Sequence, residues 1–140
     1  MPETTATVKL APYQERRGEE YMNEHQVRHF RQLLLGWRAE LLREASRTVH
    51  HLQDEALPLA DPNDRASQEE EFAVELRARE RERRLIAKID EAVRQLDSGE
   101  YGYCEDCGEP IGIRRLEARP TATLCVDCKE LQERRERQWA

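Results

Sequence analysis

The chain has 140 residues, of which 37% are charged, 38% are apolar and only 6% are aromatic. This length suits one small domain, with or without an extended appendage. The low share of apolar residues excludes a thick globular core and favours long exposed helices, each of which needs only a narrow buried stripe. Intrinsic disorder is the alternative for so charged a chain, but the regular spacing of its apolar residues argues against disorder.

The net charge of −6 is distributed unevenly. From Asp54 to Glu75 there are eight acidic residues and one basic residue, a net of 8 − 1 = 7 negative charges. From Gly112 onwards there are seven basic and five acidic residues, a net of 7 − 5 = 2 positive charges. An acidic middle disfavours contact with phosphate backbones, and it favours a basic or metal-bearing partner surface.

The first residues, "MPETTATVKLAPYQ", contain one lysine and no apolar stretch, so we see no secretory signal. No apolar run approaches the roughly 18 residues of a membrane-spanning helix. We therefore expect a soluble, cytoplasmic protein. Its four cysteines then need an explanation other than disulfide bonds, which are rare in that compartment.

Residues 1–22 show little pattern and are expected to form an N-terminal segment that packs on a globular base. The next stretch predicts a helix, because apolar residues recur every three or four positions. This face comprises Phe30, Leu34, Trp37, Leu41, Ala45, Thr48 and Leu52. Pro58 disfavours helical angles at Leu57 and is expected to end the helix.

A second helix is predicted to begin within "ADPNDRAS", residues 60–67. Asp61 can cap it, Pro62 can take the first helical position, and Asp64 then stands in the first turn. Ser67 and Glu70 offer an alternative cap and capping box. Gly99 is expected to close the helix. The predicted buried face comprises Phe72, Leu76, Ile86, Ile89, Val93 and Leu96.

Two helices of roughly 33 to 36 residues span about 50 Å each, and a short connection makes them antiparallel neighbours. We therefore predict a coiled-coil hairpin over residues 23–98, with its tip at about 58–67. Folding it about residue 62 sets Leu52 near Phe72, Thr48 near Leu76 and Trp37 near Ile86. The run "RARERERR", residues 77–84, offers only one alanine, so arginine stems are expected to cover the stripe there.

The segment over residues 99–128 carries two Cys-x-x-Cys pairs, Cys104 with Cys107 and Cys125 with Cys128. This spacing predicts a tetrahedral four-thiolate zinc site. Four protein ligands leave no open position, so the one Zn²⁺ is expected to be structural. A redox dithiol is the alternative for either pair. Residues 129–140 are predicted to form a C-terminal helix that leans on the base of the hairpin, which completes a mainly α fold.

Two further patterns carry weaker predictions. His25 and His29 have an i, i+4 spacing that can bind a metal, but no third ligand is identifiable nearby. The segment "DPNDRASQEEE" resembles a calcium loop but lacks the required glycine, so we reject that interpretation. No pairing of a nucleophile with a base and no nucleotide-binding motif is present, so the chain is not expected to be an enzyme.

Four segments together resemble the DksA/TraR zinc-finger family of bacterial RNA polymerase-binding proteins. They are "YQERRGEEYMNEHQVRHFRQLL", "DPNDRASQEEEF", "ELRARERERRLIAKI" and "GYCEDCGEPIGIRRLEARPTATLCVDCK". The resemblance implies a monomer that enters the secondary channel of RNA polymerase, contacts its β and β′ subunits and changes the stability of open complexes at ribosomal RNA and amino-acid promoters. It also implies that guanosine tetraphosphate acts with the protein, and that the protein binds no promoter sequence itself.

By position, the resemblance assigns Asp61, Asp64 and Ala66 to a tip that faces the polymerase active centre. It assigns Lys88, Arg119 and Lys129 to contacts with guanosine tetraphosphate. Without the resemblance, the two aspartates would be read as helix-capping residues, and the three cations as solvated surface charge. Two other functions remain open at this point. One is a secondary-channel factor that stimulates transcript cleavage, and the other is a zinc protein that binds nucleic acid.

Overall fold

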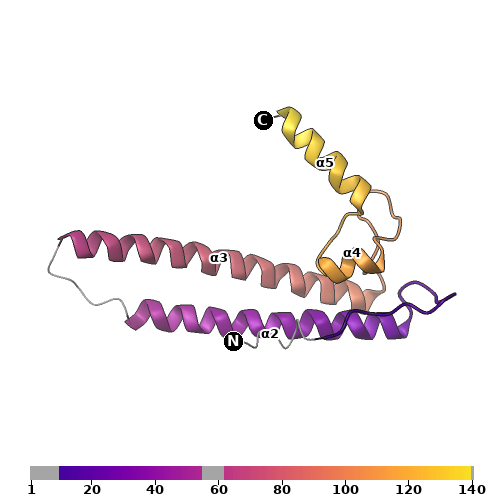
Figure 1. Cartoon of the computed structure of the whole chain (residues 1–140), viewed down its shortest axis with the longest axis horizontal. Coiled ribbons are helices and arrows are strands. Elements are labelled where there is room, and N and C mark those ends of the chain that lie inside the picture. The colour runs from indigo at the N-terminus through magenta and orange to yellow at the C-terminus, as the bar shows by residue number, and fades with distance from the viewer. Residues whose placement is uncertain (1–9, 55–61, 140) are drawn as a thin grey trace.

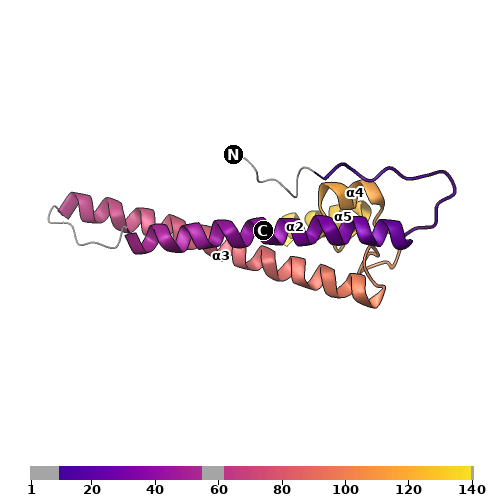
Figure 2. The same ribbon diagram turned by 90° about the horizontal axis from the view of Figure 1, so that it is seen from below.

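The structure, a computed structural model of the chain, describes residues 10–54 and 62–139. Within them lie the helices α2 (Glu24–Asp54), α3 (Pro62–Ser98), α4 (Ile113–Ala118) and α5 (Val126–Trp139). The two long helices run antiparallel, and α4 and α5 lie toward the end of the hairpin that holds the start of α2 (Figures 1 and 2). The predicted mainly α fold, with a hairpin, a cysteine module and a C-terminal helix, is confirmed.

Among the described residues, the only β-type pairing is an isolated bridge between Tyr103 and Pro110. In the same part of the chain, no helix combines the length and the apolar character that crossing a membrane requires.

The start of α2 is fixed by a local exchange of hydrogen bonds. The backbone N–H of Gln26 donates to Oδ1 of Asn23 over 3.0 Å, and the N–H of Met22 donates to Oε1 of Gln26 over 2.5 Å. These bonds resemble a capping box, in which side chains accept from the unpaired N–H groups of a first helical turn. Gln26 is fully buried, and its amide also donates to Glu19.

The ends of α3 follow the local sequence. Pro62 is its first residue and Asp64 lies in its first turn, as predicted. The predicted cap Asp61, and Leu57 and Pro58 before it, lie outside the described residues. At the other end, Gly99 has a φ of +82°, and the N–H of Glu100 bonds the carbonyl of Gln95 over 2.9 Å. Glycine adopts this angle without steric cost, so its predicted role in closing the helix is confirmed.

Among the residues that the structure describes, the buried side chains of the hairpin lie in the half nearest the cysteine module. They include Phe30, Leu34 and Leu41 from α2, and Ile89, Ala92 and Leu96 from α3. Two ion pairs set the register, Arg31 with Asp97 at 2.7 Å and Arg38 with Asp90 at 2.6 Å. The partners are seven residues apart on each helix (38 − 31 = 97 − 90 = 7), which is the repeat of an antiparallel coiled coil.

The buried stripe of α3 differs from the predicted one in its tip-side half. Spacings of three and four residues continue the stripe from Ile89 and Leu85 to Glu82 and Ala78, which are half-buried. Leu76 falls beside this line and is 52% exposed, so its predicted burial is wrong. Ile86, Val93 and Phe72 are half-buried, whereas the side chains of Thr48 and Leu52 lie outside the described part.

This stripe also corrects the predicted pairing of the two helices. When the two antiparallel helices are aligned on their buried residues, Leu41 lies opposite Leu85 and Trp37 lies opposite Ile89. Ile89 is about one helical turn from Ile86, the partner predicted for Trp37. The arginines between residues 77 and 84 are all exposed, whereas Ala78 and Glu82, which fall on the three-and-four spacing, are half-buried. A glutamate therefore lies within the stripe, at a position that the predicted buried face did not include.

The N-terminal segment is fastened to the cysteine module. The Tyr21 hydroxyl donates to the carbonyl of Gly102 over 2.7 Å and accepts from the N–H of Gly112 over 3.0 Å. Glycine is needed at position 102, because a Cβ there would lie 3.0 Å from the Tyr21 oxygen and φ is +94°. Farther along, the N–H of Tyr13 donates to Glu117 in α4 over 3.0 Å. These bonds join residues 13–21 to the base of the hairpin.

Candidate functional site: a zinc centre and an adjoining cationic pocket

The four predicted metal ligands come together. The sulfur atoms of Cys104, Cys107, Cys125 and Cys128 all lie within 4.8 Å of one another, and those of Cys107 and Cys125 are 3.8 Å apart. A tetrahedron of sulfurs about 2.3 Å from a zinc ion has edges close to 3.8 Å, so this spacing fits a four-thiolate site. No other group of three or more such ligands occurs among residues 10–54 and 62–139.

The two knuckles share one backbone design. The carbonyl of Cys104 accepts from the N–H of Gly108 over 2.9 Å, and the carbonyl of Cys125 accepts from the N–H of Lys129 over 2.9 Å. Each bond closes a turn that points two sulfurs inward. The N–H of Glu105 donates to the carbonyl of Thr123 over 2.8 Å and links the knuckles. The second knuckle forms the start of α5, so Lys129 directly follows the last ligand on the helix.

The thiol pKa values of the cluster are shifted in opposite directions. Burial opposes ionisation of Cys104, but backbone N–H groups of Cys107, Cys125 and Asp106 lower its thiol pKa to about 6. The pKa of Cys128 is raised, because Cys125 and Cys104 hydrogen-bond with its thiol. A divalent ion stabilises all four thiolates together, since coordination deprotonates each ligand. The centre is a structural zinc site.

Beside the zinc centre lies a solvent-open pocket with a volume of about 520 Å³, lined by residues of α3, α4 and α5 among others. The three cations singled out from the sequence all line it, Lys88 from α3, Arg119 after α4 and Lys129 from α5. The sequence placed them at least ten residues apart, and only the packing of three elements brings them together.

The sequence analysis missed other residues of this pocket. Arg115 is a fourth cation in its wall, and Glu91 is the one acidic residue. The charges of the lining therefore sum to 4 − 1 = 3 positive. Trp37 and Leu85 add an apolar wall, which can hold a planar group beside a charged one. The mildly basic run around Arg115 was visible in the sequence, but which of its arginines faces inward was not.

The tip residues lie at the other end of the molecule. Asp64 and Ala66 are exposed in the first turns of α3, and Asp61 lies outside the described residues. Figure 1 shows the start of α3 at the end of the hairpin that is remote from α4 and α5. The structure thus separates the tip residues from the zinc centre and the cationic pocket by most of the length of the hairpin.

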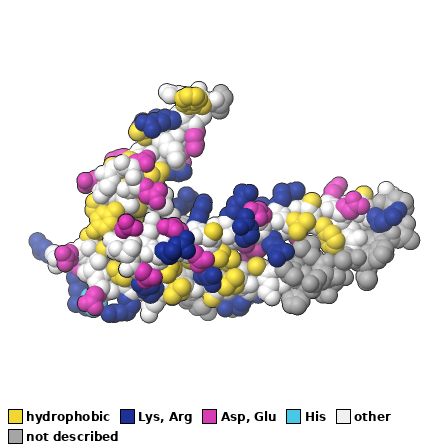
Figure 3. All heavy atoms as spheres, turned by 180° about the vertical axis from the view of Figure 1, so that it is seen from behind, with side chains coloured by type: hydrophobic (Ala, Val, Ile, Leu, Met, Phe, Trp, Pro, Cys, Tyr) yellow, Lys and Arg dark blue, Asp and Glu magenta, His cyan; other side chains and the backbone are white. Residues whose placement is uncertain are grey.

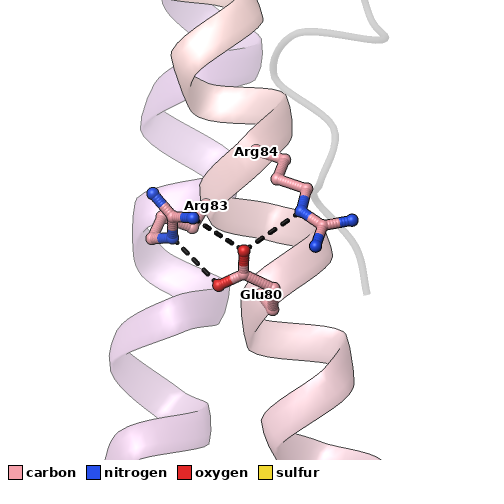
Figure 4. A network of polar contacts seen from close by, with 3 residues as sticks. All are labelled: Glu80, Arg83 and Arg84. Atoms are coloured by element: carbon pink, nitrogen blue, oxygen red, sulfur yellow. Dashed lines mark hydrogen bonds and ion pairs between the residues drawn. The ribbon is translucent and has the colours of Figure 1, made fainter.

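The middle of α3 presents charged side chains to solvent. Figure 3 shows Lys and Arg side chains gathered along the hairpin between the module and the tip-side end. Arg83 and Arg84 both donate to the carboxylate of Glu80, at 2.6 Å and 3.0 Å (Figure 4). These hydrogen bonds, that of Arg83 above all, lower the pKa of Glu80 to about 2. Exposed ion pairs of this kind contribute little to stability.

The histidine pair does not form a metal site in this structure. His29 pairs with Glu117 of α4, while His25 is exposed and lies near Arg28. The ring of His29 also packs against Tyr13 and Phe30. His29 therefore helps to hold α4 and the N-terminal segment against the first helix.

Comparisons with known families agree with this architecture. Residues 26–96 match the family model of the DnaK suppressor protein DksA, N-terminal domain. Residues 99–134 match the model of the prokaryotic dksA/traR C4-type zinc finger. The boundary between the two models falls where Gly99 ends α3, so the hairpin and the zinc module correspond to the two family units.

Individual relatives match over nearly the whole chain. The RNA polymerase-binding transcription factor DksA of Escherichia coli strain K12 is 58% identical over 135 residues, 96% of this chain and 89% of the relative. The protein of the same name from Haemophilus influenzae is 59% identical over 131 residues, 94% of this chain and 90% of the relative. The solved structure of transcription factor DksA2 from Pseudomonas aeruginosa has a TM-score of 0.79 and 50% identity, and the match covers 84% of this chain and 90% of that one. The chain belongs to the DksA/TraR family, and it combines a DksA N-terminal domain with a C4-type zinc finger.

Proposed function

We propose that this protein is an RNA polymerase-binding transcription factor that inserts its hairpin into the secondary channel of the enzyme. The names of its relatives support the partner. One observation carries the mode of action, namely that Asp64 and Ala66 are exposed at the end of the hairpin remote from the zinc module. With 37 residues, α3 extends for about 55 Å, so a narrow hairpin can reach where a globular surface cannot.

The action at the tip is electrostatic and steric rather than catalytic. A carboxylate at Asp64, with Asp61 close in sequence, can approach basic groups or the metal ion of an active centre. Ala66 leaves the adjoining surface small enough to enter a narrow channel. The protein thereby changes the stability of open complexes at promoters, including those of ribosomal RNA and amino-acid genes, and it catalyses no reaction itself.

The cationic pocket is the site at which guanosine tetraphosphate modulates this action. Lys88, Arg119 and Lys129 would neutralise the phosphates, because guanidinium and ammonium groups form charge-assisted hydrogen bonds with phosphate oxygens. The pocket is open to solvent, so a polymerase surface would complete it. We place the contacts on the β and β′ subunits, and we propose a cytoplasmic monomer that recognises no DNA sequence.

The decisive experiment measures open-complex lifetime on a ribosomal RNA promoter with purified polymerase. We expect the protein to shorten this lifetime, and we expect Asp64→Asn to lose the effect while it keeps near-normal affinity for polymerase. Asparagine keeps a side chain suited to a first helical turn but removes the charge. Glu69→Gln, which removes one exposed charge farther along the same helix, is the matched control. Undiminished regulation by Asp64→Asn would assign that carboxylate a structural role only.

The same preparation tests the two other functions. Trimming of the transcript in a stalled elongation complex would favour a cleavage factor that lends tip carboxylates to a second metal ion. Duplex binding without polymerase, weakening steeply with salt, would favour a nucleic-acid-binding protein. For the nucleotide, we expect Lys129→Ala to reduce the change in open-complex lifetime that guanosine tetraphosphate adds. An unchanged response would refute the assignment of Lys129.

A further inference from the structure

Arg115 and Gln132 line the pocket beside the zinc centre, and each makes a hydrogen bond there. We propose that Arg115 is a phosphate-binding residue of this pocket, and that Gln132 positions Lys129 to act with it. This inference rests on the proposed nucleotide site and names further residues of it. The chemical class of ligand is a nucleoside polyphosphate, whose phosphates face the cations and whose planar base faces Trp37 and Leu85.

The backbone of the zinc module holds Arg115 in a fixed position. Its Nε donates to the carbonyl of Leu124 over 2.8 Å, and the side chain is half-buried. Leu124 directly precedes the ligand Cys125, so the zinc site anchors the group that holds this arginine. In the part of the chain that the structure describes, no carboxylate forms an ion pair with Arg115, and its side-chain hydrogen bond comes from Nε. The two terminal NH₂ groups have no partner among those residues and can bind a ligand.

A held guanidinium is a better phosphate ligand than a mobile one. Arginine presents parallel N–H groups that match two phosphate oxygens, whereas lysine acts as a point charge. Ordering a free side chain on binding costs about 0.5–1.5 kcal/mol, and the bond to Leu124 removes much of that cost before the ligand arrives. Arg115 also lines a second hollow that adjoins the first, together with Arg119 and Lys129. Arg115, Arg119 and Lys129 thus border both hollows.

Gln132 acts on the neighbouring cation. The ammonium Nζ of Lys129 donates to Oε1 of Gln132 over 3.1 Å, one turn farther along α5. Lysine has only donors, so the amide oxygen must face it, and the amide NH₂ group remains as a neutral donor. Gln132 itself lines the pocket. Gln132 therefore directs the flexible side chain of Lys129 toward the pocket and leaves its positive charge in place. A glutamate at position 132 would neutralise that charge.

Arg114 provides a matched control, because it stands next to Arg115 in α4 but is exposed and lines neither hollow. The experiment uses the full-length protein bound to polymerase and measures the affinity for guanosine tetraphosphate.

We expect Arg115→Gln to weaken this affinity about tenfold or more, as loss of a charge-assisted hydrogen bond does. Arg115→Lys should restore part of this affinity and Arg114→Gln should leave it unchanged. Gln132→Ala should weaken it about threefold, and Gln132→Glu more.

A structural explanation is tested in the same series. Glutamine at position 115 can still donate to the Leu124 carbonyl, so zinc content and thermal midpoint should equal those of the parent protein. If Arg115→Gln loses zinc, Arg115→Lys is the deciding variant. Full nucleotide affinity in a folded Arg115→Lys protein would show that the positive charge suffices without the paired N–H groups of a guanidinium, and it would overturn the bidentate role. Gln132→Ala should lose nucleotide affinity without any change in zinc content, and full affinity in that variant would overturn its positioning role.

Lys129→Ala separates this inference from the proposed function. If Lys129→Ala weakens nucleotide binding and Arg115→Gln does not, the inference on Arg115 fails while the nucleotide site stands. If neither variant weakens binding, the pocket is not the nucleotide site, and both proposals for it fail. If Arg115→Gln and Arg114→Gln weaken binding equally, the effect is general charge and not a built contact, which also overturns the assignment.

Discussion

The two halves of the hairpin are held together in different ways. Near the zinc module, α2 and α3 bury Phe30, Leu34 and Ile89 completely, and the ion pairs Arg31–Asp97 and Arg38–Asp90 flank that core. In the middle, the stripe contains Glu82 opposite Glu44, and Leu76 beyond them is 52% exposed. A hairpin built in this way is stabilised mainly from its base. In the tip-side half, none of the side chains that the structure describes is fully buried, which is consistent with the insertion proposed above.

The carboxyl pair in the middle explains part of this contrast. Within the described part of the chain, the buried Oε1 of Glu82 receives no donor, although Glu44 lies within hydrogen-bonding reach of Glu82. Two ionised carboxylates only repel each other, and the contact becomes a hydrogen bond when one is protonated. Burial, and then the charge of Glu44, raise the pKa of Glu82, while Arg81 and Arg47 oppose the shift.

The largest expected effect concerns the base. Cys104→Ser, or removal of zinc with a chelator, should unfold residues 99–128, because structural zinc contributes about 10 kcal/mol or more of binding free energy that is also folding free energy. Loss of dispersed signals from Tyr101, Ile111 and Leu116 in nuclear magnetic resonance spectra would report it. Asp106→Ser, an exposed position in the same knuckle, is the control. Retention of those signals after complete removal of zinc would contradict the metal-dependent base.

The second prediction compares two adjacent leucines. Leu34 is fully buried and Leu35 is 46% exposed. Leu34→Ala should lower the free energy of unfolding by about 2–5 kcal/mol, the usual cost of truncating a buried leucine. Leu35→Ala should change it by roughly 0.5 kcal/mol or less, like most surface substitutions. Urea denaturation followed by circular dichroism measures both, and equal losses would show that the two faces of α2 are not distinguished as described.

The third prediction concerns the pH dependence of the middle. Because the pKa of Glu82 is higher in the folded state, its ionised form destabilises the fold. That destabilisation is complete above the folded-state pKa and is relieved as the pH falls toward the ordinary value of 4.5. Glu82→Gln should therefore raise stability at neutral pH by about 0.5–1.5 kcal/mol, since its amide can donate to Glu44. It should also flatten the stability profile in this window, and an unchanged profile would refute the pairing.

The smallest effect is expected two residues away. The side chain of Glu80 is 41% exposed, and its pKa is lowered to about 2, chiefly by its hydrogen bond with Arg83. The ionised form of Glu80 stabilises the fold, whereas that of Glu82 destabilises it. The stabilisation by Glu80 is present above the ordinary pKa of 4.5 and is lost as the pH falls through about 2. Glu80→Gln should cause a slight loss of stability at neutral pH that salt removes. A loss as large as that of Leu34→Ala would show that surface ion pairs hold the middle of the hairpin.

The sequence by itself determined the features that depend on local chemistry. Pro62 at the start of α3, Gly99 at its end and the two Cys-x-x-Cys pairs were predicted correctly, because a fixed φ, a left-handed turn and a ligand spacing are properties of a few neighbouring residues. The hairpin itself followed from apolar residues three and four apart. The function depended on resemblance, because the same residues alone allowed a capping role for Asp64.

Only the tertiary structure decided what depends on how two elements face each other. Leu76 and Glu82 both lie near the stripe of α3, and the way the helix faces its partner leaves Leu76 exposed and Glu82 half-buried. The register of the hairpin, about a turn from the predicted one, decides that orientation. In the same way, Arg114 and Arg115 are equivalent in the sequence, and the carbonyl of Leu124 selects the one that faces the pocket. Long-range packing sets these choices, because each depends on atoms that are distant in the chain.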